Sequence, residues 1–125
     1  MAKKKILVID DEKDFCQLTK MNLEASGEFE VTTAISGSEG INLARKYRPD
    51  LILLDIIMPG MDGAVVADEL THDETTKDTP IVFLTAVVRK KEVTDNKGVI
   101  GTRQFIAKPV TKEELLVKIR TLLNK

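Results

Sequence analysis

The sequence has little of what stabilises exported proteins or anchors membrane proteins. It contains no tryptophan, one cysteine and one histidine among 125 residues. A single cysteine excludes an internal disulfide and fits a reducing compartment, so we expect a cytoplasmic location. No apolar run approaches the roughly 18 residues that cross a membrane. The basic amino terminus is followed by only four apolar residues, which is too short for a signal-peptide core.

An excess of charge of one sign is also absent. The 19 basic residues are balanced by 20 acidic ones, which leaves a net charge of −1. Without a positive field, we expect no direct contact with nucleic acid. The one histidine, His72, lies at the end of a predicted helix and is interpreted as a surface residue rather than an acid–base catalyst. With 125 residues, of which 42% are hydrophobic, the chain predicts a single globular domain over residues 1–125.

Short apolar runs alternate with amphipathic stretches along the whole chain. Three runs are apolar throughout, as strands covered on both faces are, and two are mixed, as edge strands can be. The apolar runs are 6–9, 51–54 and 81–84, and the mixed runs are 29–34 and 104–107. Helical periodicity and two capping boxes, Ser36/Glu39 and Thr111/Glu114, predict helices between and after these runs. The predicted helices cover about 14–26, 36–47, 63–72, 87–97 and the residues from 111 onward.

Strands that alternate with helices imply βαβ units, and hence a parallel sheet with helices on both faces. Placing the apolar strands inside and the mixed strands outside gives the order 2-1-3-4-5, in which the first and third strands are neighbours. The sequence therefore predicts an α/β fold of the flavodoxin-like type. Its five-stranded parallel sheet is doubly wound with five helices.

Four of the five runs stop at polar residues that suit ligand binding. Asp10 and Asp11 follow the first run, Asp55 follows the third, and Thr85 and Lys108 close the last two. The carboxyl ends of parallel strands meet at one edge of the sheet, where open α/β sheets bind their ligands. The three aspartates belong to neighbouring strands of the predicted order. We therefore expect them to share the crevice where the strand order reverses.

Three carboxylates in one crevice repel each other unless a counter-charge joins them. Mg²⁺ supplies such a charge and binds through carboxylates, waters and phosphate oxygens. A carboxylate beside Mg²⁺, such as Asp55, can attack phosphorus, while Thr85 and Lys108 can donate hydrogen bonds to phosphoryl oxygens. These residues indicate a site for a dication and a phosphoryl group. The alternative, that each aspartate is only a solvated turn residue, explains any one of them better than all three.

Four segments of the chain resemble the motifs of a known protein family. They are Ile-Leu-Val-Ile-Asp-Asp-Glu at 6–12, Asp-Ile-Ile-Met-Pro-Gly-Met-Asp-Gly at 55–63, Leu-Thr-Ala at 84–86 and Phe-Ile-Ala-Lys-Pro at 105–109. In order and spacing they resemble the receiver domains of two-component response regulators, and the resemblance spans essentially the whole chain. It implies a phosphorylation-switched signalling domain in a phosphorelay. Such a domain accepts a phosphoryl group from a histidine kinase or a histidine phosphotransfer protein.

The resemblance gives the acidic cluster its roles. Asp55 would be the phosphoacceptor, and Lys108 would bind a phosphoryl oxygen. Mg²⁺ would be held, directly or through water, by Asp10, Asp11, Asp55 and the backbone carbonyl of Ile57.

The resemblance also implies a switch formed by Thr85 and Phe105. Thr85 would move toward the phosphoryl group, and Phe105 would change rotamer with it. Ala86 would leave room for the phosphate, and Pro109 would follow a cis peptide bond. From the residues alone, ordinary core packing of Phe105 stays open. The surface for a downstream protein target would consist of the fourth helix, the fifth strand and the fifth helix.

Two positions carry apolar residues and so depart from the pattern of the family that the chain resembles. Ile57 lies two residues beyond Asp55, and Val87 lies two residues beyond Thr85. The resemblance implies that side chains at these two positions influence the rate at which the acyl phosphate is hydrolysed. Because apolar side chains cannot orient an attacking water, we expect a long-lived phosphoryl state.

Two other functions compete with the signalling interpretation. An aspartyl-phosphate phosphatase of the haloacid-dehalogenase type would place an acid–base aspartate two residues after its nucleophile, but Glu12 stands two residues after Asp10. A phosphorylation-independent interaction domain of the same fold is the other, and the intact acidic set argues against it. We expect a domain that assists its own phosphorylation and dephosphorylation without being a turnover enzyme.

Overall fold

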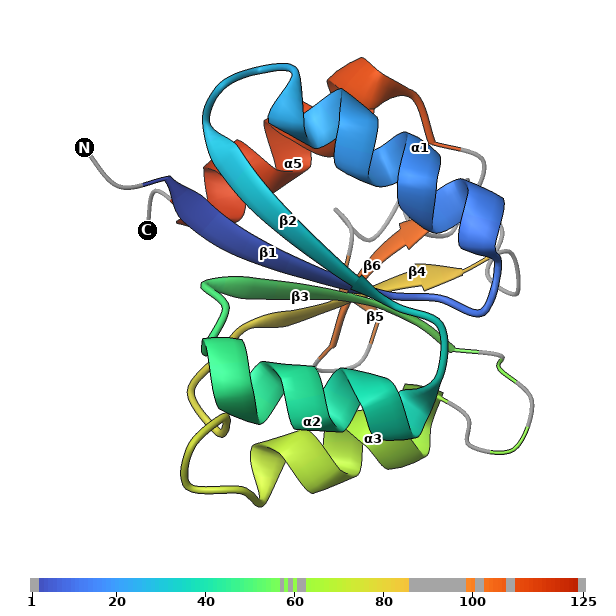
Figure 1. Ribbon diagram of the computed structural model, residues 1–125, viewed down its shortest axis with the longest axis vertical. Coiled ribbons are helices and arrows are strands. Elements are labelled where there is room, and N and C mark those ends of the chain that lie inside the picture. Colours follow the sequence, from blue (N-terminus) through green and yellow to red (C-terminus); the bar gives the residue numbers. More distant parts are fainter. Residues whose placement is uncertain are drawn as a thin grey trace.

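The computed structural model describes residues 3–56, 58, 60, 63–85, 99–100, 103–107 and 110–123 (Figure 1). In chain order its elements are β1 (Lys4–Ile9), α1 (Lys13–Glu24), β2 (Phe29–Ala34), α2 (Gly37–Tyr47), β3 (Leu51–Asp55), α3 (Gly63–Thr71), β4 (Ile81–Thr85), β5 (Val99–Ile100), β6 (Arg103–Ala107) and α5 (Lys112–Leu123). All of these elements except β5 correspond to a predicted strand or helix. The remaining predicted helix, over 87–97, lies outside the described residues.

Five strands form a parallel sheet in the order β2-β1-β3-β4-β6. Because β6 is the predicted fifth strand, the α/β class and the order 2-1-3-4-5 are confirmed. The two-residue strand β5 pairs antiparallel with β6 on its outer side. The prediction that β6 is an edge strand was therefore wrong. Two residues are too few to show an alternating pattern, which is why the sequence did not predict β5.

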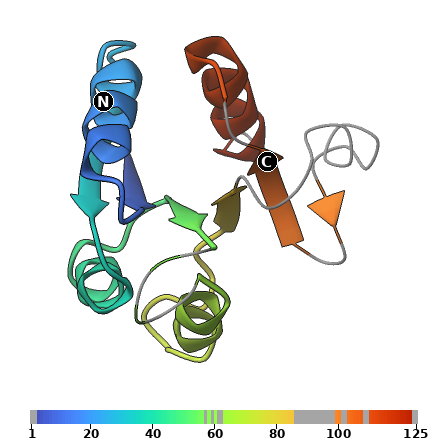
Figure 2. The same ribbon diagram turned by 90° about the vertical axis from the view of Figure 1, so that its right-hand side faces the viewer.

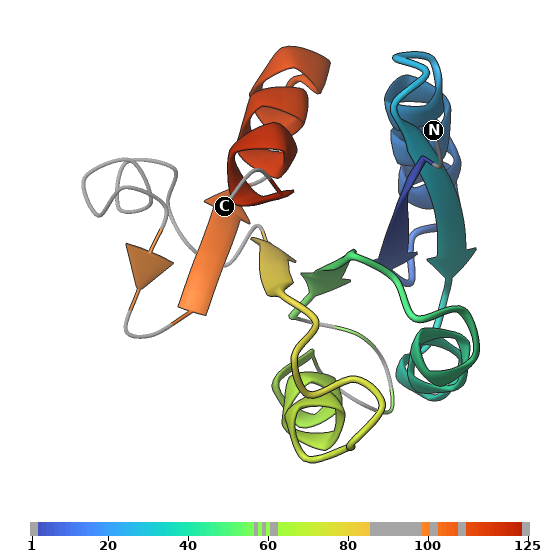
Figure 3. The same ribbon diagram turned by 90° about the vertical axis from the view of Figure 1, so that its left-hand side faces the viewer.

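Helices cover both faces of the sheet. Figure 2 and Figure 3 show α1 and α5 on one face and α2 and α3 on the other. Side chains of β1 alternate between the two layers: Ile6 and Val8 pack in the first, and Leu7 and Ile9 pack in the second. All four are nearly inaccessible to solvent. The apolar character of the whole β1 run follows from this burial on both faces. No helix in the described ranges has the length and apolar character needed to cross a bilayer.

The predicted capping residues bind at both helix starts, in a reciprocal box at Thr111/Glu114 and with Glu39 reaching one residue before Ser36 at α2. The Ser36 hydroxyl accepts a hydrogen bond from the Glu39 backbone N–H at 3.2 Å, and the Glu39 carboxylate accepts one from the N–H of Ile35 at 3.0 Å. At the start of α5, Thr111 and Glu114 exchange bonds of 3.1 and 3.2 Å between each side chain and the other residue's N–H. These bonds satisfy N–H groups that a helix start leaves without a backbone partner.

Gly40 stands inside α2 because this helix approaches β1 very closely. A Cβ atom on Gly40 would lie 2.5 Å from Cδ1 and 2.8 Å from Cγ1 of Ile9, a fully buried side chain. The neighbouring helix residues Ile41 and Ala44 are buried in the same layer. Packing against the sheet thus stabilises α2 despite the low helix propensity of glycine.

An ion pair joins α5 to the turn between α1 and β2. The Arg120 Nε donates to both carboxylate oxygens of Glu28, at 3.0 and 3.1 Å, and its Nη2 donates to one of them. These hydrogen bonds, together with the guanidinium charge, hold the pKa of the Glu28 carboxyl below its ordinary value. The two residues are 92 positions apart in the sequence. This pair therefore fixes the end of α5 to the start of β2.

The lowered pKa of Glu28 gives its ion pair a defined pH dependence. A carboxyl group with a depressed pKa in the folded state stabilises that state above its unfolded pKa and ceases to do so as the pH falls through the folded value. We expect Glu28→Gln to lower the free energy of unfolding at neutral pH, and we expect the difference from the parent protein to vanish at acidic pH. Urea denaturation over a pH series measures this. Glu30→Gln, the same change on a nearby exposed side chain, is the control; a pH-independent difference for Glu28→Gln would contradict the assignment.

Candidate functional site

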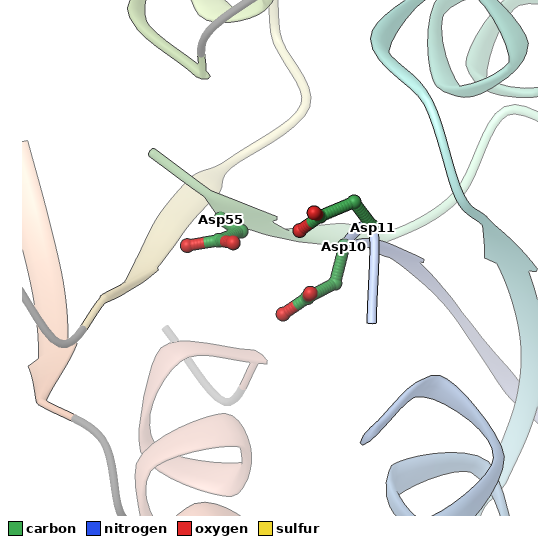
Figure 4. Close-up of side chains that lie close together, drawn as sticks. All are labelled: Asp10, Asp11 and Asp55. Carbon is green, nitrogen blue, oxygen red and sulfur yellow. The ribbon is translucent and has the colours of Figure 1, made fainter. Parts of the chain in front are cut away.

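The three aspartates meet at the carboxyl ends of β1 and β3. These strands are parallel neighbours, with Ile9 opposite Leu54, so the residues that follow in each strand lie side by side. One carboxylate oxygen from each of Asp10, Asp11 and Asp55 lies within 4.8 Å of the other two. Figure 4 shows the three side chains gathered at this edge of the sheet. The structure thus brings together residues that are 45 positions apart, as the predicted strand order requires.

The three carboxylates differ in their exposure. Asp10 is fully buried and Asp55 is 7% exposed, whereas Asp11 is exposed to solvent. Two acids near the bottom of the site and one at its rim leave an approach from the solvent side. The oxygen atoms are hard donors of the kind that Mg²⁺ and Ca²⁺ prefer. The arrangement therefore fits a hard dication.

Asp10 is held at three of its atoms. Its N–H donates to the carbonyl of Ala34 at 3.0 Å, which extends the pairing of β1 with β2 by one residue. Its Oδ1 accepts a hydrogen bond from the N–H of Glu12 at 2.9 Å, and its backbone carbonyl accepts one from the thiol of Cys16 at 3.2 Å. The hydrogen bond from Glu12 closes an Asx-turn, which aspartates before helices commonly form. These contacts fix the direction of the buried carboxylate.

The contact with Cys16 was not predicted from the sequence. Cys16 lies on the buried face of α1 and is 1% exposed. Its thiol also lies 3.9 Å from the carbonyl of Ala34. A cysteine six residues after an aspartate carries no recognisable signal for this hydrogen bond. Only the packing of α1 against the ends of β1 and β2 brings the two residues together.

The start of α3 packs against the backbone of Asp55 and Ile56. The N–H of Gly63, the first residue of α3, donates to the carbonyl of Ile56 at 2.5 Å. A Cβ atom on Gly63 would lie 2.7 Å from Cα of Ile56 and 3.0 Å from the carbonyl carbon of Asp55, and it would also collide with the Asp55 carbonyl oxygen. All of these are backbone atoms, which cannot move aside by a change of rotamer. Glycine at position 63 therefore allows α3 to begin directly against the end of β3.

The backbone of Thr85 ends β4 beside the cluster. Leu84 pairs with Asp55, and Thr85 is the next residue along the same strand. On the following strand, Phe105 is 9% exposed, and its ring stacks on Phe83 with centroids 5.3 Å apart and an angle of 28° between the planes. Both rings belong to the apolar layer under α2 and α3. In this conformation Phe105 is thus a core residue, and its change of rotamer stays a prediction.

Several predicted residues cannot be compared with the structure. Ile57, Ala86, Val87, Lys108 and Pro109 lie outside the described residues, and their roles remain predictions. His72 does lie within them. It follows the last residue of α3, and its side chain is 77% exposed, which confirms its interpretation as a surface residue.

The close approach at Gly63 can be tested with one methyl group. Although alanine favours helices, we expect Gly63→Ala to lower the free energy of unfolding by about 1–3 kcal/mol, because the methyl group meets fixed backbone. It should also shift the amide resonances of Asp55 and Ile56 in NMR spectra. Gly27→Ala is the control: Gly27 has φ +78° and open space around it, so strain should destabilise the fold while leaving the Asp55 resonances in place. Equal or higher stability of Gly63→Ala would contradict the crowding.

Comparison with known proteins gives the same family throughout. Residues 6–120 match the response regulator receiver domain family. The DNA-binding dual master transcriptional regulator RpaA of Synechocystis is 36% identical over 121 residues, which are 97% of this chain and 49% of RpaA. The response regulator PleD of Caulobacter vibrioides is 36% identical over 118 residues, 94% of this chain and 26% of PleD. The chain thus spans half or less of the length of these relatives.

Solved structures agree with this assignment. The chemotaxis protein CheY4 of Vibrio cholerae is 32% identical and superimposes with a TM-score of 0.83, covering 98% of this chain and 100% of the CheY4 chain. A putative response regulator from Chloroflexus aurantiacus gives a TM-score of 0.83 at 27% identity, covering 99% of this chain and 100% of the other. These matches favour neither the phosphatase nor the phosphorylation-independent alternative. The chain therefore belongs to the response regulator receiver domains, the phosphorylation-switched signalling modules of two-component systems.

Proposed function

We propose that Asp55 is the phosphoacceptor of this receiver domain. A carboxylate oxygen of Asp55 attacks the phosphorus of a phosphohistidine on a histidine kinase or a histidine phosphotransfer protein. A P–O bond forms while the P–N bond breaks, and the leaving imidazole takes the bonding electrons and a proton from solvent. The observation that carries this proposal is the meeting of Asp55 with Asp10 and Asp11, with one oxygen from each within 4.8 Å of the others.

We infer that the dication of this site is Mg²⁺. At 4.8 Å, the upper limit of the separation between these oxygens, and an effective dielectric constant of about 20, two ionised carboxylates alone would repel each other by about 3–4 kcal/mol. A bound dication offsets this repulsion and neutralises charge on the phosphoryl oxygens. Asp10, Asp11 and Asp55 supply side-chain oxygens, and the backbone carbonyl of Ile57 is proposed as a further ligand. The transfer itself needs positioning and charge neutralisation more than proton chemistry.

The remaining proposed site residues come from the ends of the next two strands. Thr85 donates a hydroxyl hydrogen bond to a phosphoryl oxygen, and Lys108 donates a charge-assisted one. Ala86 leaves space for the phosphate, and Pro109 follows Lys108 through a proposed cis peptide bond. The backbone register supports this placement, since Thr85 pairs with Ala107, the residue before Lys108.

We propose that the signal leaves the domain through protein contacts made by the fourth helix, β6 and α5. Phosphorylation adds close to two negative charges, and Thr85 with Phe105 converts them into a changed surface. The solvent side of α5 supports this assignment. It carries a shallow groove of about 490 Å³ around Val117, which is 60% exposed. The groove is lined by Glu113, Glu114, Val117, Lys118 and Thr121.

The proposed partners are an upstream kinase or phosphotransfer protein and a downstream protein target. RpaA is by name a DNA-binding transcriptional regulator, but this chain matches only 49% of its length. The balanced charge of residues 1–125 gives no support for DNA contact by these residues. We propose that they form one cytoplasmic domain that assists its own phosphorylation and dephosphorylation and has no other substrate to turn over.

Phosphorylation of Asp55 can be measured directly. Incubation with acetyl phosphate and Mg²⁺ should add the mass of one phosphoryl group to the intact protein. Asp55→Asn should abolish the addition because an amide cannot form the acyl phosphate, and EDTA should suppress it in the parent protein. Asp78→Asn, the same change at an exposed residue before β4, should leave the yield unchanged. Undiminished phosphorylation of Asp55→Asn would disprove the assignment, and undiminished phosphorylation in EDTA would disprove the role of the dication.

The lifetime of the phosphoryl group tests the apolar residues near the site. We expect the purified phosphoprotein to persist for minutes or longer in Mg²⁺-containing buffer, because Ile57 and Val87 cannot orient a water molecule. Ile57→Asn should shorten the lifetime about tenfold, which corresponds to one hydrogen bond of about 1.4 kcal/mol to the attacking water. Ile57→Val retains an apolar side chain and is the control. A lifetime of seconds in the parent protein would contradict this prediction.

A further inference from the structure

The strand β2 forms one edge of the sheet, and its outer side is turned away from the other strands. The carbonyls of Glu28 and Ala34 accept hydrogen bonds from Lys4 and Asp10 at the two ends of β1. In a strand, the N–H and C=O of one residue point to the same side, and alternate residues point to opposite sides. The backbone groups of Phe29, Val31 and Thr33 therefore face the outer edge, with Val31 in the middle.

Two side chains from α1 form hydrogen bonds with the backbone of Val31. The Glu24 carboxylate accepts a hydrogen bond from the N–H of Val31 at 3.1 Å, and the Lys20 ammonium donates one to the carbonyl of Val31 at 3.0 Å. The two charged groups also lie 3.9 Å from each other, one helical turn apart. Together Lys20 and Glu24 make the two contacts that a neighbouring strand would make with Val31. We call this pair the edge clamp.

The segment that the edge clamp covers is well suited to pairing with another strand. Phe-Glu-Val-Thr-Thr-Ala contains aromatic and β-branched residues, one charge and no proline. Such an edge is a template on which further strands can assemble. α1 packs beside β2 in Figure 1, and Leu23, Phe29 and Val31 are buried in the same apolar layer. This packing brings the charged side of α1 to the outer edge of the strand.

We propose that the edge clamp keeps a second copy of this chain from adding its own β2 to the sheet. Identical edges can pair antiparallel about a two-fold axis through Val31. Each Val31 would then exchange N–H and C=O bonds with the other, as directly opposed residues in an antiparallel pair do. The edge clamp makes these same two bonds within one molecule. It therefore closes the β2 edge and leaves the helical surfaces for specific contacts, whether or not Asp55 is phosphorylated.

Removal of the edge clamp should open this edge. In Lys20→Met/Glu24→Ala the long apolar stem at position 20 is retained, while both bonds to Val31 are lost. The variant should associate at lower protein concentrations than the parent protein in sedimentation measurements. At concentrations where it is still monomeric, the amide of Val31 should exchange with solvent about tenfold faster, as expected for the loss of one hydrogen bond to a charged group. In the associated form, the amides of Phe29, Val31 and Thr33 should become protected.

Three further variants separate the effect of the edge clamp from effects of charge and of folding. Glu74→Ala/Lys77→Met removes an exposed ion pair of 3.1 Å, with the same net change in charge, and should leave association unchanged. Lys20→Arg/Glu24→Gln retains a donor and an acceptor and should behave like the parent protein. If the double clamp variant does not fold, Lys20→Met alone tests the same edge. Unchanged sedimentation of a folded clamp variant, or association without protection of the three amides, would overturn the proposal.

Discussion

The parallel pairing of β1 with β3 is the contact on which the site depends. It places the ends of two buried strands next to each other, and with them carboxylates that would otherwise be far apart. The two strands are held together there by Leu7, Ile9, Leu53 and Leu54, which are fully or almost fully buried in the two apolar layers. Burial of a leucine or isoleucine side chain contributes about 1.5–3 kcal/mol. Burial of several such side chains therefore stabilises the strand pairing that brings the acids together.

The strands that form this pairing are among the parts of the molecule that could be predicted from the sequence. Fully apolar runs marked β1, β3 and β4, and a mixed run marked the edge strand β2, because burial on one or both faces leaves a pattern in the residues. Capping residues marked the starts of α2 and α5 for an equally local reason. From these elements the strand order followed, and from the order followed the meeting of Asp10, Asp11 and Asp55. Local sequence patterns were therefore sufficient to predict the site residues whose positions follow from the strand order alone.

Features that depend on close three-dimensional contact were not predictable. The hydrogen bond from Cys16 to Asp10 and the approach of Gly63 to the end of β3 join residues whose spacing follows no rule. The short strand β5 has too few residues for a pattern. Phe105 stayed ambiguous because its run is mixed, and only the packing of β6 beside β4 places its ring against Phe83. In each case the deciding information lies in how two elements touch, which one stretch of sequence does not contain.

The stacking of Phe105 on Phe83 has a consequence for any signal that passes through β6. If the ring of Phe105 turned outward, it would leave a void beside Phe83 in the layer under α2 and α3. Empty space in a packed interior is unfavourable in proportion to its volume, so the surrounding side chains or the adjoining helix would have to shift inward to fill it. Rotation of one aromatic ring is therefore inseparable from a rearrangement of the layer beneath it. A change of the outer face that involves Phe105 is thereby coupled to the packing of the interior.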